Sequence, residues 1–167
     1  MSNVRRILAV AAVVGLIVAG AGLFTSVSAT DKTAAVGVSA TVNVNCTISA
    51  GALAFGATYD PVAGGNVDGT ATITVACTKG ATATIALDDG GHFASSTRNM
   101  DDGSGNLLPY ALYSNAGRTT AWDSTTTVSY TAASKSSSGL TVYGRIPTGA
   151  DVPAGAYNDS VTATITY

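Results

Sequence analysis

Apolar and polar residues alternate with a period of two through most of the chain after residue 30. In the longest such stretch, Val36 to Ile48, Val, Ala, Cys and Ile share one face, whereas Gly, Ser, Thr and Asn share the other. This alternation is typical of β-strands that bury one face. At about 3.3 Å per residue the stretch spans roughly 43 Å, too long for one strand of a small sandwich. We therefore expect it to contain two functional pieces.

Shorter alternating stretches predict further strands. No window after the first 29 residues keeps the i, i+3, i+4, i+7 spacing of an amphipathic helix. Segments rich in Asp, Gly and Ser separate the stretches, as expected for turns. The predicted strands cover residues 69–78, 81–87, 108–113, 126–131, 140–146 and 157–167. Repeated short strands with such turns predict an all-β, Greek-key sandwich.

Composition supports this class and excludes others. Charged residues are 11% of the chain, against roughly 25% in an ordinary domain. All ten acidic residues are Asp, and the chain has no Glu and no Gln, which are common on helix surfaces. An apolar content of 46% is unlike that of disordered chains. A net charge of −2 offers no basic field for nucleic acid.

Residues 1–29 are predicted to be a secretory signal peptide. Arg5 and Arg6 precede an apolar run over residues 7–24, and small residues follow at 26–29. An uncleaved membrane anchor is the alternative, because the run has about 18 residues. Cleavage leaves six Lys and Arg against ten Asp, a net charge of about −4. No later stretch reaches membrane length, so we expect an exported protein without a membrane segment.

Two cysteines, Cys46 and Cys77, follow the predicted signal. In an oxidising compartment they are expected to form a disulfide. A closed loop of about 31 residues would contribute roughly 3–4 kcal/mol in the chain-entropy model. Their spacing fits neither a CxxC redox pair nor a zinc site, and two buried free thiols are the alternative.

The two ends of the alternating pattern do not match. The last predicted strand ends at Tyr167 without a later hairpin partner, whereas the beginning carries surplus alternating sequence. A sandwich that lacks an edge strand, together with a spare strand, indicates completion by another copy of the chain.

A series of short segments then carries a family resemblance. These segments are Phe55 with Tyr59-Asp60-Pro61, residues 73–77, 98–100 and 108–113, Trp122-Asp123, and residues 142–147 and 155–159. Because these segments occur in this order and at this spacing, the chain resembles the spore coat protein U family, which includes major pilins of the archaic chaperone–usher pathway. The resemblance covers essentially all of the chain after the predicted signal.

The resemblance implies an incomplete immunoglobulin-like sandwich that is completed by a donor strand. A periplasmic chaperone would lend a strand during folding, and an outer-membrane usher would export the subunit. The extension of the next copy would then replace the chaperone in a head-to-tail fibre at the cell surface. The implied role is structural and not enzymatic, with no cofactor and no nucleic-acid partner.

Residue by residue, the resemblance places the donor extension at 30–40 and the body at 41–167. Val36, Val38 and Ala40 would be the donor side chains that fill pockets of the next copy. Cys46 on the first body strand would pair with Cys77.

Isolated reactive residues are better explained by turns. His92, the sole histidine, follows a Gly-Gly turn and lacks a recognisable nucleophile partner. The pairs Asp88-Asp89 and Asp101-Asp102 lack the spacing of a calcium loop. We expect a surface histidine and turn carboxylates, with no metal site.

Arg145 and the aromatic residues allow structural and binding interpretations. Arg145 lies in an apolar strand, where we expect an ion pair with Asp60, Asp123 or Asp159. Core packing is favoured over a sugar-stacking platform for the aromatic set Trp122, Tyr110, Tyr113 and Tyr130, because these residues fall at strand positions. The alternatives to a fibre subunit are a monomeric carbohydrate- or surface-binding module and a self-complemented coat protein.

Overall fold

The structure, a computed structural model, describes residues 28–56 and 58–167. Most of the predicted signal peptide, residues 1–27, lies outside this range. The chain divides into two compact units after Ser39. We keep the name body for residues 41–167. In the described residues every regular element is a strand, no helix could span a membrane, and all strand pairs are antiparallel. The prediction of an all-β fold is confirmed.

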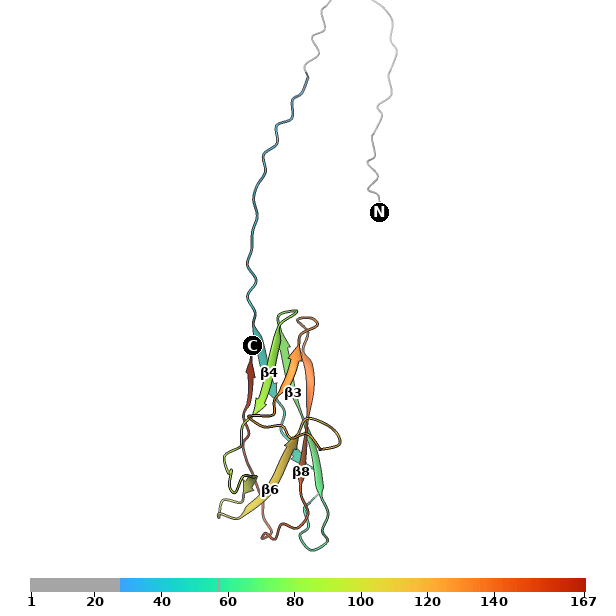
Figure 1. Ribbon diagram of the computed structural model, residues 1–167, viewed down its shortest axis with the longest axis vertical. Coiled ribbons are helices and arrows are strands. Elements are labelled where there is room, and N and C mark those ends of the chain that lie inside the picture. The colour runs from blue at the N-terminus through green and yellow to red at the C-terminus, as the bar shows by residue number, and fades with distance from the viewer. Residues whose placement is uncertain (1–27, 57) are drawn as a thin grey trace, which may run out of the picture. The chain divides into compact units, whose positions relative to one another are not determined.

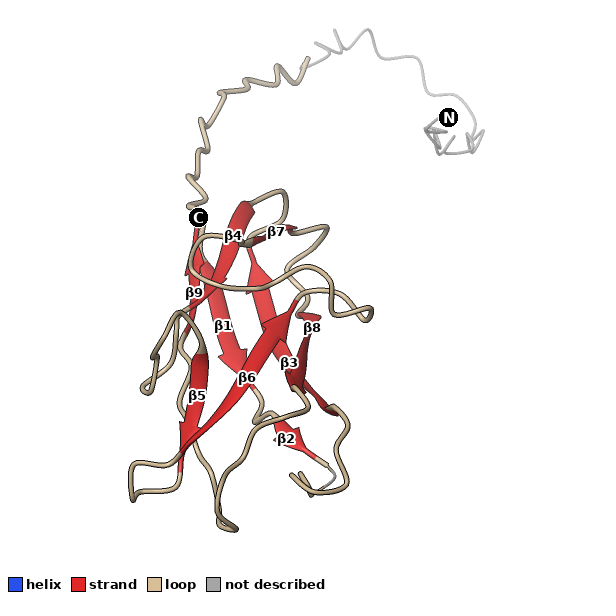
Figure 2. Cartoon of the chain, turned by 60° about the horizontal axis from the view of Figure 1, so that its bottom comes forward, coloured by secondary structure: helices blue, strands red, loops and turns tan. Residues whose placement is uncertain are grey.

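The body contains two sheets (Figures 1 and 2). The larger has the order β1-β3-β8-β6-β5, with β2 also paired to β3, and the smaller has the order β7-β4-β9. The strands are β1 (Cys46–Ala50), β2 (Ala54–Phe55), β3 (Val67–Cys77), β4 (Thr82–Leu87), β5 (Arg98–Asp101), β6 (Leu107–Tyr113), β7 (Val128–Thr131), β8 (Ser138–Ile146) and β9 (Ala163–Thr166). β1 and β9 are edge strands and lie side by side (Figure 2).

β1 and β2 form one interrupted edge. β1 pairs with Ile73–Cys77 of β3, and β2 pairs with Gly69 and Thr70 of the same strand. Since β8 occupies the other side of β3 through this region, β1 and β2 lie end to end on one side. The amide of Gly51 donates to the carbonyl of Thr72 and keeps the connection close to β3.

The core lies between the two sheets. Val75 of β3 and Ile85 of β4 are completely buried, and Trp122 is 1% exposed. The Trp122 indole N–H donates to the carbonyl of Ile85 at 2.9 Å, so this large side chain buries its polar atom with a partner. Full burial of each aliphatic side chain contributes about 1.5–3 kcal/mol.

The structure differs from the sequence prediction at both ends of the body. Only Ala163–Thr166 of the predicted strand 157–167 is regular, because Asn158 pairs with Asp101 of the larger sheet before the chain crosses to β4. At the other end the strand begins at Cys46. β3 ends opposite that residue, and beyond it Thr78 bonds to the backbone of Asn43 and Asn45.

β5 and the short β2 were not predicted. β5 breaks the alternation because Arg98 and Asn99 are consecutive, polar and both buried. The Arg98 guanidinium donates to the carbonyls of Leu87 and Asp88, and the Asn99 amide donates to the carbonyls of His92 and Thr97. These bonds offset the cost of burying polar groups in a strand.

Cys46 and Cys77 form a disulfide, with Cα atoms 4.1 Å apart. The two residues are direct cross-strand partners at the start of β1 and the end of β3. The bond therefore fastens an edge strand to an interior strand of the larger sheet.

Replacing both cysteines by serine is expected to lower the free energy of unfolding by about 3 kcal/mol, because the unfolded chain regains the entropy of a loop of roughly 31 residues. Urea unfolding of the purified protein measures this change. The unreduced, denatured wild-type protein should show no free thiol. Equal unfolding midpoints for the variant and the wild type would contradict the expected contribution.

Candidate functional site

An apolar groove separates the two sheet edges. Its first cavity has a volume of about 580 Å³ and lies between Ala50–Phe55, at the edge of the larger sheet, and Tyr157–Ala163, the segment that crosses from Asp101 of the larger sheet to β4 of the smaller one. Core side chains of both sheets reach it, namely Ile73, Leu87, Leu112 and Val142. A cavity of about 150 Å³ accommodates benzene, so this volume is suited to several side chains.

A second cavity of about 540 Å³ continues the first. The two share lining residues, including Leu53, Phe55 and Tyr157. The second cavity extends past them to Tyr59 and Val152 at the loop end of the body. The cavities together form one groove along the edge of the sandwich.

Both edges of the groove carry unpaired backbone. β1 pairs only with β3, and β9 pairs only with β4. Among the described residues, Ser160 and Val161 make no backbone hydrogen bond to another segment. Unpaired N–H and C=O groups beside an apolar floor can accept a further β-strand.

Two glycines of the larger sheet allow residues 53–55, which form one wall of the groove, to lie close to that sheet. A Cβ on Gly69 would lie 2.8 Å from the carbonyl oxygen of Ala54, and one on Gly144 would lie 2.9 Å from the methyl groups of Leu53. Phe55 lies above the same glycines and packs edge-on against Tyr110, with ring centroids 6.4 Å apart. Small residues of β3 and β8 thus allow this wall to approach the sheet.

A buried carboxylate fixes the opposite wall. The Asp159 side chain is 3% exposed and accepts hydrogen bonds from the Tyr110 hydroxyl at 2.6 Å and the Gly91 amide at 2.9 Å. His92 Nδ1 lies 3.2 Å from the same carboxylate. Burial, and then the bond to Asp159, raise the pKa of Tyr110 far above its ordinary value, so Tyr110 remains a donor. These contacts position the irregular segment before β9.

Asp88 secures the next turn of this wall. Its carboxylate accepts from the amides of Thr162 at 2.9 Å and Gly90 at 3.0 Å. Burial raises the pKa of Asp88, but hydrogen bonds from Thr162 and Gly90 outweigh burial and leave the pKa below its ordinary value of 3.8. The ionised form therefore stabilises the fold.

The proposed donor residues Val36, Val38 and Ala40 lie outside all strands of the structure. Val36 and Val38 are 85% and 92% exposed, and Ala40 is also exposed. Two large apolar side chains on one face of the alternating pattern are thus left without cover. Their role as donor side chains remains a prediction.

The ion-pair prediction named the wrong carboxylates. Arg145 contacts Asp68, with Nε 2.7 Å from Oδ1 and Nη2 2.9 Å from Oδ2. The register of β3 and β8 places these residues directly opposite, and Arg118 adds a third charge 3.2 Å from Oδ2. The hydrogen bond from Arg145 lowers the pKa of Asp68. This cross-strand pair depends on register, which single-strand patterns do not contain.

The other candidate groups have structural roles. Trp122 and Tyr110 are buried, so the packing interpretation is correct for both and neither offers a sugar-stacking face. His92 lies on an exposed loop. The turn 101–106 is closed by Asp101 and Asp102, whose carboxylates accept backbone amides. Within residues 28–56 and 58–167, no group of three His, Cys, Asp or Glu side chains could hold a metal.

The fold is an immunoglobulin-like sandwich similar to that of pilus subunits. One similar solved structure is the chaperone–tip adhesion subunit complex CsuC–CsuE from archaic Csu pili of Acinetobacter baumannii. Its TM-score is 0.55 at 19% identity, over 76% of this chain and 40% of that chain. The P pilus rod subunit PapA also has a TM-score of 0.55, at 21% identity, over 73% of this chain and 98% of that chain.

The family is shown by sequence. Residues 32–164 match the Spore Coat Protein U domain, and the chain belongs to this family. It is 36% identical to Protein U of Myxococcus xanthus over 181 aligned positions, which cover 95% of this chain and 99% of that protein.

Gly69→Ala is expected to destabilise the body by about 1–3 kcal/mol, because its Cβ would force the backbone of β2 away from β3. Gly51→Ala is the matched control, since a Cβ there meets nothing closer than 3.6 Å. Urea unfolding compares the two variants. Equal unfolding midpoints would argue against the close contact between β2 and Gly69.

The Asp88 carboxylate is expected to give a pH-dependent stability. Since its folded pKa is lowered, its contribution is complete above pH 3.8 and is lost as the pH falls through the folded pKa. Thermal unfolding of the wild type and Asp88→Asn between pH 2 and pH 7 measures this. The difference in melting temperature between them should shrink in acid, and a constant difference would refute the assignment.

Proposed function

We propose that this protein is a structural subunit of an extracellular pilus or coat, and not an enzyme. Each copy donates its N-terminal extension, residues 30–40, as a strand to the groove of the next copy. The observation that carries the proposal is the apolar groove between two unpaired sheet edges. Family membership and the pilus-subunit fold support it.

The extension has the chemistry that such a groove requires. Val36, Val38 and Ala40 fall on one face, and the two valines are largely exposed. A strand added between the Ala50–Phe55 and Tyr157–Ala163 segments would pair its backbone with their open groups and direct alternate side chains to the floor. Each valine buried there would contribute about 1.5–3 kcal/mol.

The length of the donor segment is compatible with the length of the groove wall. Residues 36–40 span about 13 Å as a strand, and a seven-residue segment such as Tyr157–Ala163 reaches at most about 20 Å. Three alternate side chains therefore fit beside this wall. Donation from one end of a copy to the groove of another is a head-to-tail contact, which produces an open filament.

The open groove also implies that a chaperone is needed during folding. Open sheet edges beside such a groove can pair with other chains and so promote aggregation. We infer that a periplasmic chaperone fills the groove after signal cleavage and that an outer-membrane usher exchanges it for the next subunit. The structural similarity to a subunit solved with its chaperone supports this route.

Val36→Asp together with Val38→Asp should abolish the fibre and leave the chaperone–subunit complex intact. Each buried carboxylate removes the valine burial and adds a desolvation penalty, several kcal/mol per junction in total. Complex yield and surface fibre are measured together by immunoblotting and electron microscopy.

The matched control is Gly37→Asp with Ser39→Asp, which places the same charges on the opposite face. Fibre should persist in this control. Loss of both complex and fibre in the valine variant would favour self-complementation. A stable wild-type monomer that retains a carbohydrate would favour the binding module instead.

A further inference from the structure

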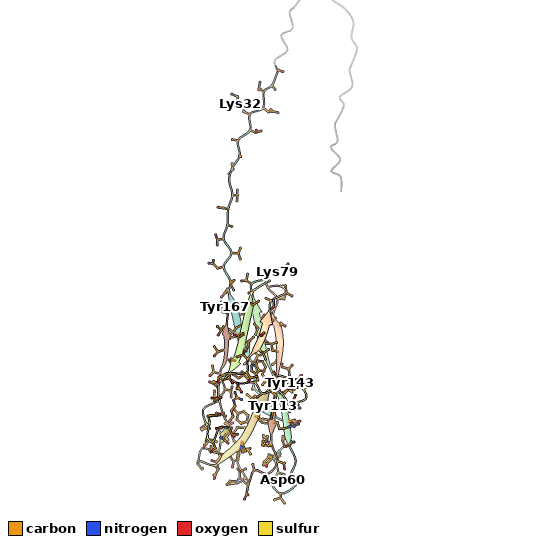
Figure 3. The ribbon with its side chains drawn as sticks, viewed as in Figure 1. Lys32, Asp60, Lys79, Tyr113, Tyr143 and Tyr167 are labelled. Carbon is orange, nitrogen blue, oxygen red and sulfur yellow. A yellow bond between two sulfur atoms is a disulfide. The ribbon has the colours of Figure 1, made fainter. Side chains whose placement is uncertain are left out.

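One end of the body is basic. Lys79 lies in the turn between β3 and β4, and Lys135 lies in the loop between β7 and β8. Hydrogen bonds of Gly80 and Ala81 with Ala132 bring these two turns together. Tyr167 lies at the same end, and its hydroxyl donates to Asn45 where the chain enters β1 (Figure 3).

The opposite end is acidic. Asp60 lies there, far from Lys79 along the body (Figure 3). The Tyr59 hydroxyl binds the backbone of Ala150, which brings Asp151 to the same loops. The turn that holds Asp102 lies beside Gly155 in this region. The second cavity opens among these loops, where it is lined by Tyr59, Pro61 and Val152.

The direction of the donor strand decides which ends meet. Antiparallel pairing with the Tyr157–Thr166 edge is favoured, because every strand pair of the body is antiparallel. A donor in this direction begins near Ala163 and ends near Tyr157. Its connection to the incoming body therefore leaves the groove at the acidic end, beside the second cavity.

We propose that the second cavity receives Val42 of the incoming copy, and that the basic end of that copy then faces the acidic end of the acceptor. This inference rests on the proposed function. With Val36 to Ala40 beside the first cavity, Val42 lies about 7 Å further along the strand, at the second. Val42 is 81% exposed and belongs to the same apolar face.

The chain leaves little distance between the two bodies. Thr78 binds the carbonyl of Asn43, so Val42 is the last residue before the incoming body holds the backbone. Lys79 follows Thr78 directly. The lysines would then stand within about one Debye length, roughly 8–10 Å, of the acidic loops. The cavity fixes the position of the incoming body, and the charges favour this partner orientation.

Cysteine crosslinking of the full-length fibre tests the position of Val42. In Val42→Cys with Val152→Cys, a reducible covalent ladder is expected between copies, since Val152 lines the second cavity. The control is Thr41→Cys with Val152→Cys, whose cysteine faces away from the groove. The ladder should be roughly tenfold stronger in the first variant, because proximity raises the effective concentration.

Charge reversal tests the facing ends without altering the groove. Lys79→Asp with Lys135→Asp should slow fibre assembly roughly tenfold at low salt, and the difference from wild type should vanish near 1 M salt. This inference is overturned if the Val42→Cys, Val152→Cys variant forms fibres without a ladder and the lysine variant assembles at the wild-type rate. Donor-strand assembly itself would then remain intact. Absence of fibre from the wild-type chain overturns the proposed function and this inference together.

Discussion

The body has a gap where a strand would join the two sheets, and much of the molecule is arranged around this gap. β1 and β2 form one side, and the segment that leads into β9 forms the other. Backbone groups along both sides can pair with a further strand, and the groove between them is lined largely by apolar side chains. An alternating β-strand matches both features at once, whereas a helix would satisfy its own backbone and leave the edges unpaired.

Other contacts fix the walls of the gap in position. Asp159 binds Tyr110 and Gly91, and Asp88 binds Thr162, so the wall before β9 is fixed without a neighbouring strand. On the other wall, Gly144 leaves room for Leu53 and Phe55 to lie close to the sheet. Preorganised walls reduce the ordering cost when a strand enters.

The sequence predicts the elements whose burial follows a period of two. β3, β4, β6 and β8 alternate over six or more residues, and their positions are close to those predicted. β2 is too short to show a period, and β5 buries the polar pair Arg98 and Asn99 through bonds to distant carbonyls.

The candidate site is only partly visible in the sequence. Surplus alternation before Cys46 predicts a spare strand, but the groove that could receive it is formed by segments 50–55 and 157–163, which are far apart in the sequence. The contacts that fix the walls of this groove are also between distant residues. No residue near Asp159 in the sequence indicates that Asp159 binds Gly91 and Tyr110. Likewise, Arg145 meets Asp68 through register alone. Such pairings depend on tertiary contacts, which local patterns do not specify.

The polarity of the body gives the proposed assembly a direction. The extension leads into the basic end, where the disulfide joins Cys46 of the edge strand to Cys77 of β3. The groove continues to the acidic end. A two-fold dimer made through either end would bring like charges together, whereas head-to-tail stacking pairs unlike ends at each junction. The charge distribution thus opposes closed pairs and favours the open filament that a donated strand would create.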